Sequence, residues 1–300
     1  MISICIPVYN YDVSRLVTDL SIQAESSYVP VEIIIIDDFS EERYRRNNRL
    51  VCKEHIYIEL DHNTGRARIR NLFITYANYR YLLFLDCDSI ISSSNFLEKY
   101  IGLTPQQPSV VCGGSTYTLM CPGRRQKLRW KYGKLRESKP ADIRNGNPHR
   151  SFLSNNFLAD RRIFDRIKFD ENLSGYGYED TLFGYSLRKA GIEVIHTDNQ
   201  VLNGGLESNK AYLKKTREAV LNLVEMVKSG RYGDDLNDYI SLLHFYNKIE
   251  KYKNCIGLVY IVFRPVIYFL LARGYIFLAL FDLYRLGLFI RLSRSLQSQK

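Results

Sequence analysis

Short apolar runs that alternate with amphipathic segments fill the first ninety residues, and no other feature limits the possible folds so strongly. Four of these runs have the length of buried strands, at residues 2–7, 31–36, 55–60 and 81–85. Between them, apolar residues recur at helical spacing over residues 13–20 and 69–76. Strands that alternate with helices in this way predict an α/β fold with a mostly parallel, Rossmann-like sheet flanked by helices.

Each of the four predicted strands runs into polar residues at its carboxyl end. In chain order these ends are Pro7-Val8-Tyr9-Asn10, Asp37-Asp38, Asp61-His62-Asn63-Thr64-Gly65 and Asp86-Cys87-Asp88. Ligands of such sheets gather beyond the carboxyl ends of the strands. Carboxylates on one edge of a sheet repel one another unless a cation or a donor-rich ligand joins them. The pattern therefore predicts a ligand site at this edge.

Asp86 and Asp88 are separated by one residue at the end of the fourth predicted strand. Side chains at positions i and i+2 of a strand point to the same side, so both carboxylates can face one ion. A hard divalent cation takes oxygen ligands and bridges carboxylates to a diphosphate. The spacing favours a metal site, and an aspartate-rich turn after a strand is the common alternative.

A second acidic pair, Glu179 and Asp180, opens a helix predicted over residues 180–190. Acidic residues in a first helical turn can simply cap the helix and complement its dipole. A carboxylate within hydrogen-bond reach of a substrate hydroxyl can also act as a general base. The residues by themselves leave both roles open.

Further elements are predicted after residue 94. Residues 109–114 and 192–196 have the pattern of strands, and residues 210–227 that of a strongly amphipathic helix. The polar and basic stretch over residues 124–148 predicts a mobile surface loop.

Two apolar runs, at residues 256–271 and 275–292, lie near the end of the sequence, and charged residues interrupt both of them. Neither run reaches the roughly eighteen uninterrupted apolar residues of a spanning helix. Apolar faces flanked by Arg and Lys predict amphipathic helices that lie in a membrane interface. A pair of core helices closing the domain is the alternative.

The formal net charge of +10 suits a nucleic acid, an anionic membrane or a phosphorylated ligand as partner. Much of the excess falls in residues 124–150 and in the apolar tail, which favours a membrane surface over nucleic acid. The chain lacks the glycine motifs of dinucleotide dehydrogenases and P-loop enzymes. Six cysteines without a C-x-x-C pair, and an N-terminus without signal-peptide features, predict a cytoplasmic protein.

Five motifs taken together resemble those of glycosyltransferase family 2, the inverting enzymes with the GT-A fold. The matching residues are Pro7-Val8-Tyr9-Asn10, Asp37-Asp38-Phe39-Ser40, Asn63-Thr64-Gly65 with Ala67 and Asn71, Asp86-Cys87-Asp88, and Gly177-Tyr178-Glu179-Asp180. The motifs follow the family's order, and the resemblance spans residues 2–205.

The resemblance implies a nucleotide pocket at the ends of the first two strands. Residues that would line it are Pro7, Tyr9, Asn10, Asp37 and Asp38. Asp38 would accept a hydrogen bond from the base, which is typically uracil in this family. The segment after the third strand would approach the donor, through Asn63, Gly65, Arg66 and Arg70. A guanidinium there could contact the diphosphate, the alternative being a solvated helix face.

The resemblance also implies the catalytic groups. Asp86 and Asp88 would bind the base-proximal sugar and the metal, Asp180 would be the catalytic base, and Glu179 would hold or orient the acceptor. Many relatives have a further histidine ligand where this chain has Asn203. An amide oxygen can coordinate manganese or magnesium, although it binds manganese more weakly than imidazole does. His196 is expected to have no metal role.

Two other positions keep alternatives open. Asn155 and Asn156 sit where relatives contact the sugar, but they could equally be turn residues. Trp130 could stack on an acceptor sugar or anchor the basic loop.

The resemblance therefore leads us to expect a metal-dependent inverting transferase that uses a UDP-sugar and a glycan or lipid-linked saccharide, in cell-surface polysaccharide synthesis. Residues 1–230 would form the GT-A domain, with a nucleotide half over 1–90 and an acceptor half over 91–230. Residues 231–300 would be a helical extension that holds the protein at the inner face of the cell membrane. A non-catalytic nucleotide-sugar or glycan-binding protein with an impaired metal site is the alternative.

Overall fold

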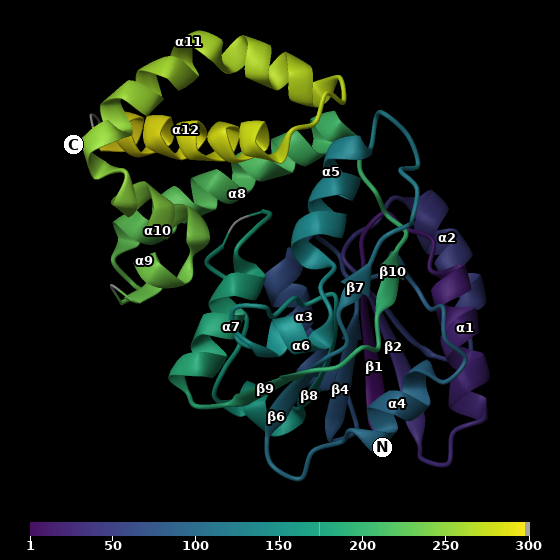
Figure 1. The fold of residues 1–300 in the computed structure, drawn as a ribbon. Helices are drawn as coiled ribbons and strands as arrows, with labels where there is room; N and C mark the ends of the chain where they lie inside the picture. Colours follow the sequence, from purple (N-terminus) through teal and green to yellow (C-terminus); the bar gives the residue numbers. More distant parts are fainter. Residues whose placement is uncertain (174, 234, 298–300) are drawn as a thin grey trace. The chain divides into compact units, whose positions relative to one another are not determined.

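The computed structural model describes residues 1–173, 175–233 and 235–297 of the chain (Figure 1). The chain divides into two compact units. The first is formed by Met1–Tyr117, Glu137–Asn172 and Glu179–Gly205, and the second by Thr118–Arg136, Leu173–Tyr178 and Leu206–Lys300. The predicted domain boundary at residue 230 stays a prediction. In the structure, the segment from residue 206 onward packs with the C-terminal helices.

A seven-stranded sheet of order β3-β2-β1-β4-β8-β6-β9 forms the centre of the first unit. Its strands are β1 (Ile2–Val8), β2 (Val31–Asp37), β3 (Ile56–Glu59), β4 (Tyr81–Leu85), β6 (Ser109–Cys112), β8 (Asn156–Asp160) and β9 (Glu193–His196). Strand β8 runs antiparallel to both of its neighbours, and the other pairs are parallel. The predicted α/β fold with a mostly parallel sheet is confirmed.

Helices cover both faces of this sheet because its strands are apolar on both sides. Ile4 and Ile6 belong to one core cluster together with Leu16, whereas Cys5 belongs to the other cluster together with Phe73. The first cluster lies under α1 (Ser14–Glu25) and α4 (Phe96–Gly102), and the second under α3 (Arg66–Tyr76) and α7 (Glu179–Lys189). Figure 1 shows α1 and α3 on opposite faces of the sheet.

The remaining elements of this unit are short. A second sheet of order β5-β10-β7 joins Ser89–Ile90, Val201–Asn203 and Ser115–Thr116. The helical segments are α2 (Glu42–Val51), α6 (Ala141–Asn145) and the 3-10 turn η2 (Arg161–Asp165). The sequence pattern did not predict α2, α4 or β8. Helix α2 has few apolar residues, and α4 and β8 are too short to show a clear periodicity.

Stacked aromatic rings connect the strands to the helix that carries the second acidic pair. The rings of Phe84 on β4 and Phe157 on β8 stack with centroids 4.8 Å apart. Phe183 on α7 stacks on Phe169 at 4.1 Å. Phe84 lies two residues before Asp86, and Phe183 lies three residues after Asp180. The packing of these rings therefore fixes the backbone positions from which the side chains of Asp86 and Asp180 extend.

The second unit is helical. It contains α5 (Lys127–Tyr132), most of the π-helix η1 (Gly133–Glu137), α8 (Asn209–Ser229), α9 (Asp235–Tyr239), α10 (Ser241–Lys248), η3 (Glu250–Tyr252), α11 (Lys253–Ala272) and α12 (Leu278–Gln297). The predicted loop over residues 124–148 is wrong, because α5, η1 and α6 lie there. Buried Leu128 anchors α5, and its backbone amide donates to the side chain of Asn209 at 2.9 Å.

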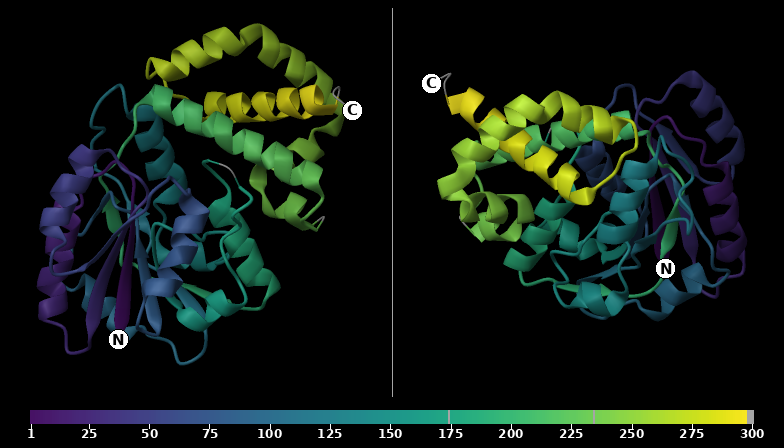
Figure 2. Two further views of the ribbon diagram at one scale, coloured as in Figure 1. Left: turned by 180° about the vertical axis from the view of Figure 1, so that it is seen from behind. Right: turned by 45° about the horizontal axis from the view of Figure 1, so that its top comes forward.

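Helix α12 lies between α8 and α11 in Figure 1 and in the left view of Figure 2. Tyr260 on α11 packs so closely on Gly287 of α12 that a Cβ atom at Gly287 would lie 2.2 Å from the Tyr260 ring. Among the described helices, one segment, Glu250–Ala272, has the length and apolar composition of a membrane span. The alternative that these segments are core helices thus fits α12, whereas most residues of α11 are exposed.

Replacing Phe157 by Ala should lower the free energy of unfolding by about 3–5 kcal/mol, because the lost ring leaves a cavity against Phe84. Denaturant titration followed by fluorescence measures this change. Tyr28→Ala is the control, since that side chain is 75% exposed and its loss should cost within about 0.5 kcal/mol. Equal effects of the two substitutions would contradict this description of the core.

Candidate active site

The carboxyl ends of β1, β2, β3 and β4 meet at one edge of the large sheet, as their parallel pairing requires. Pro7 lies within β1, beside Ile36 of β2. Tyr9 follows β1 and is 55% exposed at this edge. The loops that carry the remaining predicted nucleotide residues lie beside it, and internal hydrogen bonds fix them.

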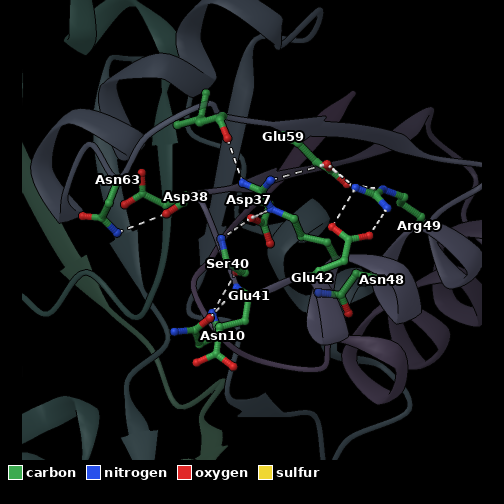
Figure 3. Close-up of polar contacts among 12 residues, drawn as sticks. Asn10, Asp37, Asp38, Ser40, Glu41, Glu42, Asn48, Arg49, Glu59 and Asn63 are labelled. Atoms are coloured by element: carbon green, nitrogen blue, oxygen red, sulfur yellow. Dashed lines mark hydrogen bonds and ion pairs between the residues drawn. The ribbon is translucent and has the colours of Figure 1, made fainter.

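Asp37 organises the loop after β2 (Figure 3). It is fully buried, and its Oδ1 accepts hydrogen bonds from the Ser40 amide at 2.7 Å and from Arg45 Nε at 3.2 Å. Asn10 N donates to Ser40 Oγ at 2.8 Å, and Asn10 Oδ1 accepts from the Glu41 amide at 2.8 Å. These bonds join the ends of β1 and β2 into one structure.

Asp38 ties the loop after β3 to the end of β2. Its carboxylate accepts from the Thr64 amide at 2.6 Å, the Thr64 hydroxyl at 2.8 Å and the Gly65 amide at 3.0 Å. Asn63 Nδ2 donates to the Asp38 carbonyl at 3.1 Å (Figure 3). Gly65 has φ +85°, which favours glycine, and it directly precedes α3. Asp38 thus holds the start of α3, and its predicted contact with a base stays a prediction.

Two arginines of α3 bind the acidic pairs that the sequence singled out. Arg70 Nη2 donates to Asp86 Oδ1 at 2.8 Å, and Arg66 Nη1 lies 3.4 Å from Glu179 Oε1. Arg66 and Arg70 are one helical turn apart, and Arg70 Nη1 also donates to the Arg66 carbonyl. Helix α3 therefore connects the end of β4 to the start of α7.

Burial separates the roles of these arginines. Arg70 is only 2% exposed, so it acts on Asp86 and is shielded from a ligand. These contacts do not support its predicted contact with a diphosphate, because the guanidinium is buried and donates to Asp86. The side chain of Arg66 is 44% exposed and keeps its predicted role as a candidate diphosphate contact.

Asp180 has the features of a general base. Burial raises the pKa of Asp180 to about 6, the charge of Glu179 adds to this rise, and Arg70 and a hydrogen bond from Ser154 oppose it. Its Oδ1 is buried and has no hydrogen-bond partner among the described residues. The carboxylate can therefore ionise near neutral pH and has an acceptor atom available for a substrate hydroxyl.

Asp88 and Asn203 come together through the second sheet. Asn203 pairs with Ser89, the residue after Asp88, and the Gly204 amide donates to the Asp88 carbonyl at 2.9 Å. A Cβ atom at Gly205 would lie 2.3 Å from Asp88 Oδ2, so glycine is required for this approach. Asn203 Oδ1 is buried and has no hydrogen-bond partner in the described part of the chain.

The donor set of this corner fits a hard divalent cation. Asp86, Asp88 and the amide of Asn203, whose Oδ1 has no partner among the described residues, offer the oxygen atoms that such a cation prefers, and Cys87 between the aspartates packs against the core. Within the described ranges, no group of three or more His, Cys, Asp or Glu residues could hold a metal. A cation here would therefore depend on the amide and on oxygens of a bound diphosphate.

His196 cannot complete this set because both of its ring nitrogens are occupied. Nδ1 accepts from Arg144 Nη1 at 2.7 Å, and Nε2 donates to the Pro148 carbonyl at 2.9 Å. Burial, together with the charge of Arg144, lowers the pKa of His196 to about 4. The neutral imidazole supports β9 and has no metal role.

The surroundings of Asn156 do not support its predicted contact with a sugar. It is 1% exposed, its Oδ1 accepts from the Tyr100 hydroxyl, and its Nδ2 donates to the carbonyls of Gly114 and Asn199. No polar atom of its side chain is left for a sugar. The neighbouring Asn155 instead has a buried Oδ1 without a partner among the described residues, and its carbonyl accepts from the Asp86 amide.

Several functional contacts were missed by sequence reasoning. Arg70 binds Asp86, Ser154 binds Asp180, and Arg45 binds Asp37. The i, i+4 spacing of Arg66 and Arg70 was the only available signal. Trp130 lies on α5 and donates its indole N–H to the Thr118 carbonyl at 2.9 Å, and its stacking on an acceptor sugar stays a prediction.

The layered sheet with acidic residues along one edge is the GT-A fold of glycosyltransferases, as comparison with solved structures shows. A mannosyltransferase from Pyrobaculum calidifontis, solved with GDP-mannose and Mn²⁺, is similar over 100% of this chain and 88% of its own, with TM-score 0.64 and 12% identity. Glucosyl-3-phosphoglycerate synthase from Mycobacterium tuberculosis, solved with Mn²⁺ and UDP, is similar over 75% of this chain and 79% of its own, with TM-score 0.51 and 18% identity.

Sequence comparison gives the family. The model of glycosyl transferase family 2 matches residues 3–167, and the chain belongs to this family. An uncharacterized glycosyltransferase of Haemophilus influenzae is 25% identical over 256 residues, which cover 84% of this chain and 98% of the relative. The resemblance read from the motifs is thus confirmed.

Asp180→Asn should stabilise the protein at neutral pH. The native pKa of about 6 lies above the ordinary value of 3.8, so ionisation disfavours folding above pH 6 and has no effect below about pH 4. We expect the variant to gain about 1–2 kcal/mol of unfolding free energy at pH 8, after allowance for partial exposure, and almost none at pH 4. Asp165→Asn, at an exposed position, is the control. A gain that does not depend on pH would contradict the shifted pKa.

Proposed function

We propose that the chain catalyses single-displacement transfer of a sugar from a UDP-sugar to a hydroxyl of a glycan or lipid-linked saccharide. The observation that carries this proposal is Asp180, whose buried Oδ1 lacks a partner among the described residues and whose pKa is raised to about 6. The base stands in one network with Asp86, because Arg70 bonds to Asp86 and its charge also acts on Asp180.

In the proposed reaction, Asp180 accepts the proton of the acceptor hydroxyl while the oxygen attacks the anomeric carbon of the donor. The bond from that carbon to the diphosphate breaks on the opposite face, and UDP leaves with the electron pair. Configuration at the carbon inverts. Glu179, held by Arg66, would orient the acceptor. Its negative charge also raises the pKa of Asp180, which makes Asp180 a stronger base toward the acceptor hydroxyl.

Donor binding would use the other end of the network. Tyr9, Asn10 and the Asp37–Asp38 loop would hold the nucleotide, and Arg66 would approach the diphosphate. Asp86, Asp88 and Asn203 would hold manganese or magnesium. When bound, this cation supplies neutralisation of the charge that develops on the departing diphosphate. The mannosyltransferase and the synthase were solved with Mn²⁺, which supports a cation here too.

We also propose a cellular setting. The apolar helix α11 supports attachment of residues 231–300 to the inner face of the cell membrane. An acceptor carried by a lipid would meet the site there, as in assembly of a cell-surface polysaccharide. All six cysteines are free thiols, which agrees with the cytoplasmic side.

Transfer can be tested by UDP release from a panel of UDP-sugars, with GDP-mannose as a further donor and lipid-linked saccharides as acceptors. We expect release with Mn²⁺ or Mg²⁺ and little with EDTA. Asp180→Asn should lower kcat by about 10²–10⁴-fold and leave the Kd for UDP unchanged, because it removes only the base. Asp165→Asn should behave as wild type. UDP binding without release from any donor would instead favour the non-catalytic alternative.

The pH profile gives a further test of the base. Because Asp180 must be ionised to accept a proton, kcat should fall as the pH drops through about 6. Glu179→Gln removes a charge that raises this pKa, so the acidic limb of the profile should move to lower pH. An unchanged limb in an active Glu179→Gln variant would exclude Asp180 as the titrating group.

A further inference from the structure

The outward side of α11 is continuously apolar. Its exposed large side chains are 41–63% accessible: Leu258, Val259, Val262, Phe263, Val266 and Phe269. The opposite side of the helix packs within the unit through Gly257, Tyr260, Ile267 and Leu271. Arg264 is exposed, but its position four residues after Tyr260 and three before Ile267 places it on the helix side that carries the packed residues. The outer side has no charged residue between Asn254 and Ala272.

A second apolar element comes from a distant part of the sequence. Leu119 and Met120 are 87% and 83% exposed. The backbone around them is held by α5 and η1, since Trp130 Nε1 of α5 donates to the Thr118 carbonyl and Lys134 Nζ of η1 donates to the Leu119 carbonyl at 2.7 Å. Two adjacent apolar side chains are therefore held in solvent by a fixed loop, which is typical of a binding surface.

Hydrogen bonds connect this loop to the turn between α11 and α12. Arg124 Nε donates to the Arg273 carbonyl at 2.8 Å, and Lys131 Nζ donates to the Ile276 carbonyl at 3.1 Å. Gly274 has φ +85° and lies so close that its Cβ would be 2.5 Å from the Arg124 carbonyl oxygen. Phe277, 69% exposed, lies in the same turn. The loop and the hairpin thus belong to one surface of the second unit.

Exposed cations accompany this surface. Arg124 and Arg125 follow the Leu119–Met120 loop, Arg273 lies in the hairpin turn, and Lys251 lies just before α11. The acidic groups near both ends are already paired: Asp282 with Arg136 at 2.9 Å, and Glu250 with Lys253 at 3.4 Å. Apolar side chains fringed by exposed Arg and Lys match the interface of an anionic bilayer.

We propose that the outer side of α11 and the Leu119–Met120 loop form one membrane-insertion surface, which seats in a single leaflet of an anionic bilayer. Helix α11 lies in the plane of the leaflet, because its inner side is packed along α12 and a spanning helix would have to leave that partner. Its 20 residues then lay about 30 Å of apolar helix along the membrane. This inference rests on the proposed membrane attachment of residues 231–300 and deepens it. It does not depend on sugar transfer, since vesicle binding is measurable whether or not transfer occurs.

Flotation of the full chain with vesicles tests the surface. The protein should float with vesicles of phosphatidylcholine and phosphatidylglycerol, and much less with phosphatidylcholine alone. Leu119→Ser with Met120→Ser should lower the partition coefficient by about tenfold or more, because both side chains leave the apolar phase. The matched control is Ile22→Ser with Leu50→Ser, which changes two side chains of the first unit that are 60% and 58% exposed.

Equal binding of the Leu119/Met120 variant, the control and the wild type would overturn the composite surface. A wild-type chain that ignores vesicles and forms dimers would also overturn it, since a second copy would then cover α11. Extraction of bound protein with alkaline carbonate tests the in-plane arrangement. Release supports it, whereas retention in the pellet would show a spanning helix.

Discussion

The ion pair between Arg70 and Asp86 fixes the end of β4 against helix α3, and the candidate site is built around it. A guanidinium that is 2% exposed is costly to bury unless a carboxylate accepts from it. The pair therefore constrains where α3 can lie. Because the same helix presents Arg66 to Glu179, one element sets the positions of two acidic pairs from distant parts of the sequence.

The position of α3 depends in turn on the loop before it. Asp38 accepts both the Thr64 and the Gly65 amides, so the helix begins at a fixed point beyond β2. Asp37 stabilises that strand end through Ser40 and Arg45. Asp37 and Asp38, which the family resemblance places in the nucleotide pocket, thus also hold the protein's own loops. A ligand would therefore bind to a site that these hydrogen bonds have already shaped.

Charge is distributed unevenly across the site. Arg70 neutralises Asp86 and Arg66 faces Glu179, but the raised pKa of Asp180 shows that its negative charge is poorly compensated. Such a group lowers stability when ionised and is correspondingly ready to accept a proton. The side chains of Asp180, Asn155 and Asn203 each have a buried oxygen without a partner among the described residues, which a substrate or a cation would supply.

The sequence allowed a prediction of the sheet, of its acidic edge and of the acidic start of α7, because strand periodicity places residues such as Asp38 and Asp86 at the same edge. The roles of Arg70 and Asn156 could not be predicted. Each is decided by tertiary partners, Asp86 for one and Tyr100, Gly114 and Asn199 for the other. Helix α5 was missed because its composition is basic and polar, while its stability comes from burial of Leu128.

Calorimetric titration of the chain with UDP, in Mn²⁺ and again in EDTA, tests most directly whether the acidic edge holds a cation-bridged diphosphate. The account predicts that UDP binds about tenfold or more tightly with Mn²⁺, a difference of at least about 1.4 kcal/mol. Binding of equal affinity in both buffers, or no binding of UDP in either, would contradict it.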